Sequence, residues 1–525
     1  MDVEEFRKRG KEMVDYVADY WESIRERQPL SDAKPGFIWD LVPNEAPEQP
    51  ESWEKIFADI DSVVLKNNTH WQHPRFFAYF PTSNSYPAVI GDILSTGIAS
   101  IGFTWNSSPS MTELEMATMD WLAKLLGLSE HFLNASEGPG AGMIQSTASD
   151  ATLVAMLAAR EKASSKAQTV LSNGFLENLT SYVPEGVKNF VTRLTSATVK
   201  QFAATSAPEA HPQHGHHTQG MIKYRHGDVM PKLVAYCSDQ AHSGVERAAL
   251  LAAVTIRKLR TQRKDGYALT AMTLETAIRE DVSAGLVPFF LCATVGATTL
   301  CSVDRLRELA EVCAKYDVYV HVDAAYAGSA AICPEYRHLL DGVEWLRVNF
   351  DCSCMWFKNA PEVVNTFLVD PVYLKHSHQN SIVPDYRNLQ IPLGRRFRSI
   401  KLWFVLRAFG AEKLREHIRT MCGLSKQFGE LVETSDDFEL FVPVTLGLVC
   451  FRAKGSDERN RRLHEAINAD RRIHLVPSVV DDAYFLRLSI CSTLTNAQDI
   501  QYAWEVVQEL NAQLGDKQPS EKQQP

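Results

Sequence analysis

The stretch YVHVDAAYAG, Tyr319 to Gly328, organises the predicted fold. Its first residues are rich in Val and Tyr and contain no Gly or Pro, which is typical of a buried strand in a parallel sheet. Asp323 falls where that strand ends, and open α/β sheets bind ligands outside the carboxyl ends of their strands. Ala324 and Ala325 leave room for a flat group. Asp323 therefore pairs with a bound ring nitrogen or caps the following turn.

The segments before this stretch show a repeated order of predicted strand, turn and helix. VPFFLCATVGATT, residues 287–299, predicts a buried strand followed by a turn, and residues 305–316 predict a helix that leads into YVHVD. Residues 232–252 predict a strand, a polar turn and a helix, with His242 at the strand exit. Strand, turn and helix in this order indicate right-handed βαβ units, so we expect an α/β fold with a parallel sheet.

Composition limits the function classes. A chain of 525 residues predicts two or three domains. Its 54 Lys and Arg against 64 Asp and Glu give a net charge of -10, which argues against nucleic acid or an anionic membrane as a partner. The start, MDVEEFRKRG, is unlike a secretory signal, and no apolar run reaches membrane-spanning length. The 10 cysteines form no framework, so we expect reduced thiols in a cytoplasmic protein.

A phosphate-binding turn is predicted before an alanine-rich helix at residues 140–160. Thr147 and Asp150 fit a capping box, and small residues at a helix start leave backbone N–H groups open to an anion. Ala148 and Ser149 would be the donors. Many capped helices bind nothing, so structural capping is the alternative.

An aromatic segment, THWQHPRFFAYFPTSNSYP, covers residues 69–87. Its prolines exclude regular helix or strand. Trp71, Tyr79 and Phe80 either pack in the core or wall a flat pocket for an aromatic substrate.

Residues 162–230 are rich in Ser, Thr, Gln and Ala and include a histidine tract, HPQHGHHTQGMIKYRH. These histidines lack the spacing of a zinc site, so we predict no metal there and expect a mobile surface insertion. Arg395, Arg396 and Arg398 are interpreted as ion-pairing residues and not as a nucleic-acid patch.

Eight motifs together resemble the pyridoxal 5'-phosphate (PLP)-dependent aromatic-L-amino-acid decarboxylases of group II. They are SSPSMTELE, QSTASDATL, YCSDQAHSGVERA, HVDAAYAGSA, NFDCSCMW, DPVYLKHSHQ, IPLGRRFRS and HLVP. The resemblance runs from near residue 1 to about residue 510, apart from the insertion. It implies a fold type I homodimer with a helical N-terminal dimerisation segment (1–85), a large PLP-binding domain (86–400) and a small C-terminal α+β domain (401–512). The polar composition of residues 513–525 predicts a disordered tail.

The resemblance also implies roles for single residues. Ala148 and Ser149 would hold the phosphate of PLP, with Thr298 nearby, and His242 would stack on the ring. Asp323 would pair with the ring nitrogen, beside Ala325. The residues implied to line the substrate pocket are Trp71, Tyr79, Phe80, Thr82 and Gly394, with Ile101 and Phe103 contributed across the dimer interface.

Three positions bear on the reaction. Tyr373 matches the tyrosine on the family's mobile loop, which delivers a proton to the substrate carbon. Related aldehyde synthases carry Phe in place of this tyrosine or Asn in place of His242, so decarboxylation is favoured over aldehyde formation. Gly394 stands where the similar histidine decarboxylases carry Ser, which favours a bulky aromatic substrate such as dopa, 5-hydroxytryptophan, tyrosine or tryptophan.

One departure from the family is severe. Relatives have a segment containing Asn-Pro-His-Lys between the positions of Glu344 and Trp345, and its lysine forms the Schiff base with PLP. Here the two residues are adjacent, as though about eleven residues were missing. Lys358 matches a different lysine of the relatives. Loss of the covalent route predicts turnover lower by orders of magnitude. The gap is either a splicing or gene-prediction error, or the mark of a non-catalytic dimer partner.

Overall fold

The computed structural model describes residues 1–82, 84–172, 229–343, 347–350, 354–368, 374 and 384–515. The chain divides into two compact units, one made of residues 1–84 and 416–525 and the other of residues 85–415. The N-terminal segment and the C-terminal part therefore belong to one unit. The boundary between the units falls inside α12 (Arg398–Glu433), a helix interrupted at Gly410.

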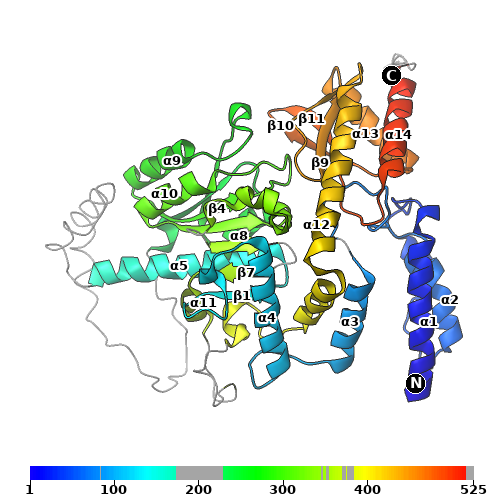
Figure 1. The fold of residues 1–525 in the computed structure, drawn as a ribbon, viewed down its shortest axis with the longest axis horizontal. Helices are drawn as coiled ribbons and strands as arrows, with labels where there is room; N and C mark the ends of the chain where they lie inside the picture. The colour runs from blue at the N-terminus through cyan, green and yellow to red at the C-terminus, as the bar shows by residue number, and fades with distance from the viewer. Residues whose placement is uncertain are drawn as a thin grey trace. The chain divides into compact units, whose positions relative to one another are not determined.

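A seven-stranded sheet forms the centre of the unit 85–415 (Figure 1). Its strands are β1 (Ala141–Ile144), β2 (Leu233–Ser238), β3 (Thr255–Leu259), β4 (Val287–Thr294), β5 (Tyr319–Ala324), β6 (Arg347–Phe350) and β7 (Cys354–Phe357). The order is β1-β7-β6-β5-β4-β2-β3. Five neighbouring strands of this order, β6, β5, β4, β2 and β3, are parallel. β7 runs antiparallel to both β6 and β1. The predicted α/β fold with a mostly parallel sheet is confirmed.

Helices cover both faces of this sheet. Ala235 and Cys237 of β2 pack in one core with α5 (Ala148–Ser172), α8 (Ser243–Ala252) and α11 (Ala360–Phe367). Tyr236 lies between them on the strand and points to the other face, where its hydroxyl donates to Asp281 of α9 (Ala271–Ser283) at 2.8 Å. α10 (Leu306–Tyr316) packs beside α9. Asp323 shares the α5 face, since His321 and Asp323 alternate with Val322.

Helix α5 corrects part of the predicted insertion. The helix continues to Ser172, so residues 162–172 are helical and not part of a mobile surface loop. Ser164 is buried against Met230, and Lys162 forms an ion pair with Glu362 at 3.3 Å. Ala, Ser and Lys in this stretch are compatible with a helix that packs along one side, so composition alone was misleading. Residues 173–228, including the histidine tract, lie outside the described residues.

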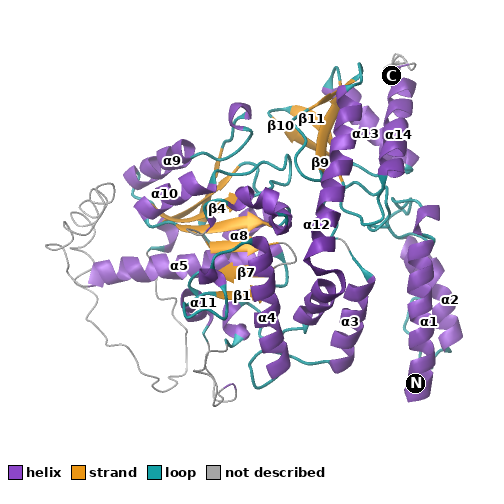
Figure 2. Cartoon of the chain, in the orientation of Figure 1, coloured by secondary structure: helices purple, strands orange, loops and turns teal. Residues whose placement is uncertain are grey.

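The other unit joins N-terminal helices to a small antiparallel sheet (Figure 2). The helices are α1 (Val3–Glu22) and α2 (Trp53–Asp59), which continues as η3 (Ile60–Leu65). The sheet order is β10-β11-β9-β8, with β8 (Phe438–Leu440), β9 (Leu448–Ala453), β10 (Val476–Val480) and β11 (Ala483–Ser489). Its core packs against α12, α13 (Asp457–Asp470) and α14 (Ala497–Gly515). The predicted small α+β region is thus present.

In the described part of the chain, no helix has both the length and the apolar character that a membrane span requires.

Candidate active site

Asp323 lies at the carboxyl end of β5, in register with Thr294 of β4. The side chain is buried, and Oδ1 accepts a hydrogen bond from the backbone N–H of Ala325 at 3.1 Å. Burial raises the pKa of this carboxyl group, while the Ala325 N–H and the charge of His242 act in the opposite direction. A cationic ring nitrogen placed here would favour the ionised carboxylate further.

His242 is the N-cap of α8, the helix that follows β2. Its Nδ1 accepts a hydrogen bond from the backbone N–H of Gly244 at 3.0 Å. A Cβ on Gly244 would lie 2.8 Å from Ser149 Oγ and 2.9 Å from His242 Nδ1, so only glycine lets these two side chains come together here. The structure therefore brings His242 and Ser149 to one place, on either side of Gly244.

The predicted phosphate turn joins β1 to α5. Thr147 caps the helix, since its Oγ1 accepts a hydrogen bond from the backbone N–H of Asp150 at 3.0 Å. Ala148 is the first residue of α5, and both Ala148 and Ser149 are half-buried. A helix of this length directs a positive dipole end and open N–H groups to the edge where Asp323 lies.

Thr298 lies in the turn after β4 and is half-buried. The next residue, Thr299, donates from its hydroxyl to Gln240 Oε1 in the loop after β2. A Cβ on Gly296 would lie 2.5 Å from the Cβ of Ala327, in the loop after β5. The loops after three adjacent strands are therefore packed against one another around the candidate site.

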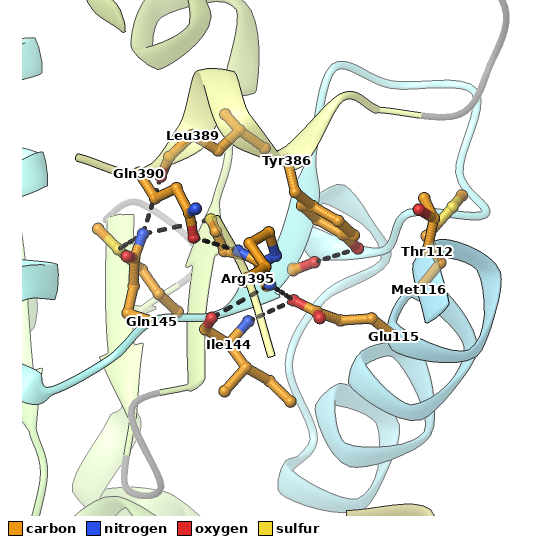
Figure 3. Close-up of polar contacts among 12 residues, drawn as sticks. Thr112, Glu115, Met116, Ile144, Gln145, Tyr386, Leu389, Gln390 and Arg395 are labelled. Carbon is orange, nitrogen blue, oxygen red and sulfur yellow. Dashed lines mark hydrogen bonds and ion pairs between the residues drawn. The ribbon is translucent and has the colours of Figure 1, made fainter. Parts of the chain in front are cut away.

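A buried polar cluster fixes the chain just before the phosphate turn (Figure 3). Glu115 of α4 (Pro109–Leu126) forms an ion pair with Arg395, and both side chains are buried. Glu115 Oε1 also accepts from the backbone N–H of Ile144 at 2.8 Å. Gln145 donates from Nε2 to the carbonyl of Leu389 at 2.8 Å. The cluster therefore anchors residues 144–145 to α4 and to the segment 386–395, and the interpretation of Arg395 as an ion-pairing residue is confirmed.

The aromatic residues proposed for the substrate lie in the unit 1–84 and 416–525. Trp71 and Tyr79 stack with ring centroids 5.3 Å apart, and they are 47% and 50% exposed. The guanidinium of Arg487 lies 5.0 Å from the Phe80 ring centroid. The Thr82 carbonyl accepts from Gln72 Nε2 at 2.9 Å. The Trp71 and Tyr79 rings therefore pack on the buried Phe76 while about half of each side chain stays exposed.

The remaining substrate candidates lie in the unit 85–415. Ile101 is 56% exposed, and a Cβ on Gly394 would lie 3.8 Å from Ile101 Cγ2. The Phe103 carbonyl accepts a hydrogen bond from the Arg387 backbone N–H at 3.4 Å. The structure thus places Ile101, Phe103 and Gly394 on two adjoining loops of the same chain.

Two predicted features fall on residues that the structure leaves out. Tyr373 and the junction between residues 344 and 345 lie outside the described residues. Lys358 follows β7, which is antiparallel to β6, so the chain there runs away from the edge that carries Asp323. Met355 is level with Asp323 through Asn349, so Lys358 lies roughly 10 Å farther along the strand direction. It is therefore not a substitute for the missing lysine.

Sequence reasoning missed one pair of residues at this site. His321 Nε2 lies 3.2 Å from the Oγ1 of Thr152, in the second turn of α5. Burial lowers the pKa of His321 to about 3, so the imidazole is neutral at pH 7. A signal was present, because His321 precedes Asp323 by two residues and shares its face of the sheet.

The buried carboxylate, the nearby imidazole and the open helix start define a cofactor-dependent enzyme of the α/β class, and these donors fit PLP. The comparisons then identify the family. Residues 35–197 and 201–454 match the model described as the pyridoxal-dependent decarboxylase conserved domain. This chain belongs to that family.

Individual relatives agree with the family assignment. Aromatic-L-amino-acid decarboxylase of Drosophila melanogaster is 46% identical over 97% of this chain and 91% of its own length. Oryza sativa TDC, crystallised with PLP and tryptamine, is 32% identical with a TM-score of 0.85, covering 98% of this chain and 99% of that chain. Catharanthus roseus tryptophan decarboxylase in complex with L-tryptophan is 34% identical with a TM-score of 0.83 and the same coverage.

Proposed function

We propose that this protein decarboxylates aromatic L-amino acids with PLP, releasing the corresponding amine and CO2. The observation that carries the proposal is the position of Asp323, buried at the carboxyl end of β5, on the sheet face where His321 contacts Thr152 near the start of α5. The family assignment and the 46% identical aromatic-L-amino-acid decarboxylase support it.

Different residues of the site are proposed to hold different parts of the cofactor. Ala148, Ser149 and Thr298 would hold the phosphate, and His242 would stack on the ring. Asp323 would keep a proton on the ring nitrogen. PLP, when bound, would supply the electron sink that decarboxylation of the substrate needs. Ala325 keeps its N–H on the Asp323 carboxylate and fixes the direction of that side chain.

The substrate is an aromatic amino acid with a large side chain. We propose that Trp71, Tyr79, Phe80, Thr82 and Gly394 contact the substrate, and that Ile101 and Phe103 are contributed across the dimer interface. The exposed, stacked rings of Trp71 and Tyr79 offer a flat apolar surface of the kind that aromatic substrates need. The Catharanthus roseus relative binds L-tryptophan, which is one of the four candidate substrates with dopa, 5-hydroxytryptophan and tyrosine.

Because this chain lacks the lysine segment, its activity is expected to differ from that of family members that carry it. With Glu344 joined directly to Trp345, we expect this chain to bind PLP without a covalent anchor and to turn over slowly. Full activity then belongs to a form that carries the segment. If no such form exists, the non-catalytic dimer partner becomes the function.

The test compares this chain with a variant that carries the family's Asn-Pro-His-Lys segment between Glu344 and Trp345. Both are incubated with PLP and each of the four amino acids, and amine, aldehyde, peroxide and CO2 are measured. We expect amine and CO2 in equal amounts from the variant. Aldehyde with peroxide indicates an aldehyde synthase instead, and no product from the variant contradicts the proposal. Sequencing the transcript across residues 344 and 345 shows whether the longer form occurs naturally.

We also propose that the protein is a cytoplasmic homodimer. Helix α3 (Tyr86–Ile98) exposes an apolar stripe consisting of Tyr86, Ile90, Ile93, Leu94 and Ile98. Such a stripe is typical of a helix that packs against another subunit. The nine cysteines within the described residues are free thiols, as expected in a reducing compartment. Light scattering of the purified protein tests the dimer, and an Ile93→Glu variant is expected to be monomeric.

A further inference from the structure

A hydrogen-bonded pair connects β5 to the second turn of α5. His321 of β5 is 1% exposed, and Thr152 of α5 is 2% exposed. Thr152 Oγ1 donates to the backbone carbonyl of Ala148 at 3.1 Å and lies 3.2 Å from His321 Nε2. The His321 ring also stacks on Phe290, with centroids 6.1 Å apart. Packing therefore fixes the imidazole from the side while the hydroxyl fixes its tip.

The Thr152 hydroxyl has two partners, the Ala148 carbonyl and His321 Nε2. A threonine hydroxyl can donate one hydrogen and also accept, so it can bond to the carbonyl and to the imidazole at the same time. The hydroxyl thus links the strand to the backbone of the helix start.

The end point of this chain of bonds matters for anion binding. The Ala148 carbonyl and the Ser149 N–H belong to the same planar trans peptide group and point in opposite directions. Holding the carbonyl toward Thr152 therefore directs the Ser149 N–H out of the helix start, where an anion binds. Any tilt of the carbonyl tilts the donor by the same angle.

The same strand also carries Asp323. His321 and Asp323 lie on one face of β5, roughly 7 Å apart along the strand. One rigid element thus fixes both the carboxylate for the ring nitrogen and the direction of a donor for the phosphate. Neither His321 nor Thr152 needs to touch the cofactor to have this effect.

We propose that His321 and Thr152 are positioning residues that aim the Ser149 N–H at the cofactor phosphate and set its placement relative to Asp323. This inference rests on the proposed function, because it assumes that PLP binds at this edge of the sheet. His321 and Thr152 are expected to strengthen binding of the cofactor phosphate and to leave binding of the ring unchanged.

The test uses two probes that need no lysine for binding, pyridoxamine 5'-phosphate and pyridoxamine, which lacks the phosphate. Their dissociation constants are measured by calorimetry for the full chain and for Thr152→Val, Thr152→Ala and Thr152→Ser. We expect Thr152→Val and Thr152→Ala to weaken the binding of pyridoxamine 5'-phosphate roughly tenfold, because one aligned donor is lost. We expect the affinity for pyridoxamine to stay unchanged. Thr152→Ser keeps the hydroxyl and is expected to restore the affinity.

The outcomes separate the positioning role from the proposed function. A wild-type chain that binds neither probe contradicts the proposed cofactor, and the role of the pair with it. A wild-type chain that binds pyridoxamine 5'-phosphate while the hydroxyl-free variants bind it equally well overturns the role of the pair alone. Equal weakening of both probes also overturns it, because a general packing defect does not distinguish the phosphate. Thr152→Ala removes the hydroxyl without a branched side chain, so a folding defect confined to Thr152→Val leaves the test intact.

Discussion

Glu115 and Arg395 form an ion pair in which one carboxylate oxygen accepts from both the guanidinium and the Ile144 backbone N–H. The side chains of Glu115 and Arg395 are 0% and 2% exposed. Arg395 also lies over the Tyr386 ring, 4.7 Å from its centroid. Helix α4, the end of β1 and the segment that follows Tyr386 therefore share one buried charge pair.

Removing one charge of this pair is expected to be costly. Glu115→Gln leaves the Arg395 guanidinium buried without its counter-charge, so we expect the free energy of unfolding to fall by about 3–5 kcal/mol. Arg395→Met is expected to cost a similar amount, and the double variant less than the sum of both. Denaturant unfolding of the four proteins measures this. Strict additivity would show that the pair does not act as one unit.

The buried imidazole of His321 makes stability depend on pH. Its pKa is about 3 in the folded protein, below the ordinary value of 6.5, because burial disfavours the charged ring. The unfolded chain therefore binds the proton more tightly, and stability is lost as pH falls from 6.5 toward 3. Compared with His321→Asn, the wild type should lose up to about 1.4 kcal/mol more per pH unit in this window. Parallel pH dependences of the two proteins would contradict this assignment.

Asp323 is expected to reduce stability when no cofactor is bound. Burial raises the pKa of its carboxyl group, so the ionised form is unfavourable in the folded protein at neutral pH. Asp323→Asn should raise the melting temperature of the cofactor-free protein and abolish most of the stabilisation by pyridoxamine 5'-phosphate. Thermal melts with and without that ligand measure both effects. A lower melting temperature of the cofactor-free variant would show that the carboxylate is structural.

Gly244 is expected to tolerate no side chain. Alanine at this position meets Ser149 Oγ and His242 Nδ1 at less than 3.0 Å, so one of the two must move. We expect Gly244→Ala to weaken the binding of pyridoxamine 5'-phosphate at least tenfold, which corresponds to a loss of binding free energy on the order of 1.4 kcal/mol. Gly423→Ala is the control, because nothing lies within 4 Å of a Cβ there. Equal affinity of both variants would place the ligand elsewhere.

The sequence was informative wherever the chemistry follows directly from a strand end. Asp323 and His242 each stand at the exit of a strand, and the carboxyl ends of parallel strands meet at one edge, so their proximity was predictable. The cap at Thr147 was predictable for a different reason, because its partner Asp150 is only three residues away in the sequence.

Contacts between distant segments were not predictable. Thr152 and His321 are 169 residues apart, and their contact depends on how α5 packs across the sheet. The same holds for Glu115 and Arg395, which are separated by 280 residues. The end of α5 was misplaced because Ala, Ser and Lys occur equally in surface helices and in mobile loops, and only packing against Met230 distinguishes the two.

Asp323 is proposed to keep a proton on the ring nitrogen of a bound cofactor. The most direct test is the ¹⁵N chemical shift of ring-labelled pyridoxamine 5'-phosphate bound to this chain and to Asp323→Asn at neutral pH. We predict the shift of a protonated nitrogen in the wild type and of an unprotonated nitrogen in the variant. An unprotonated nitrogen in the wild type, or the same shift in both proteins, would contradict the account.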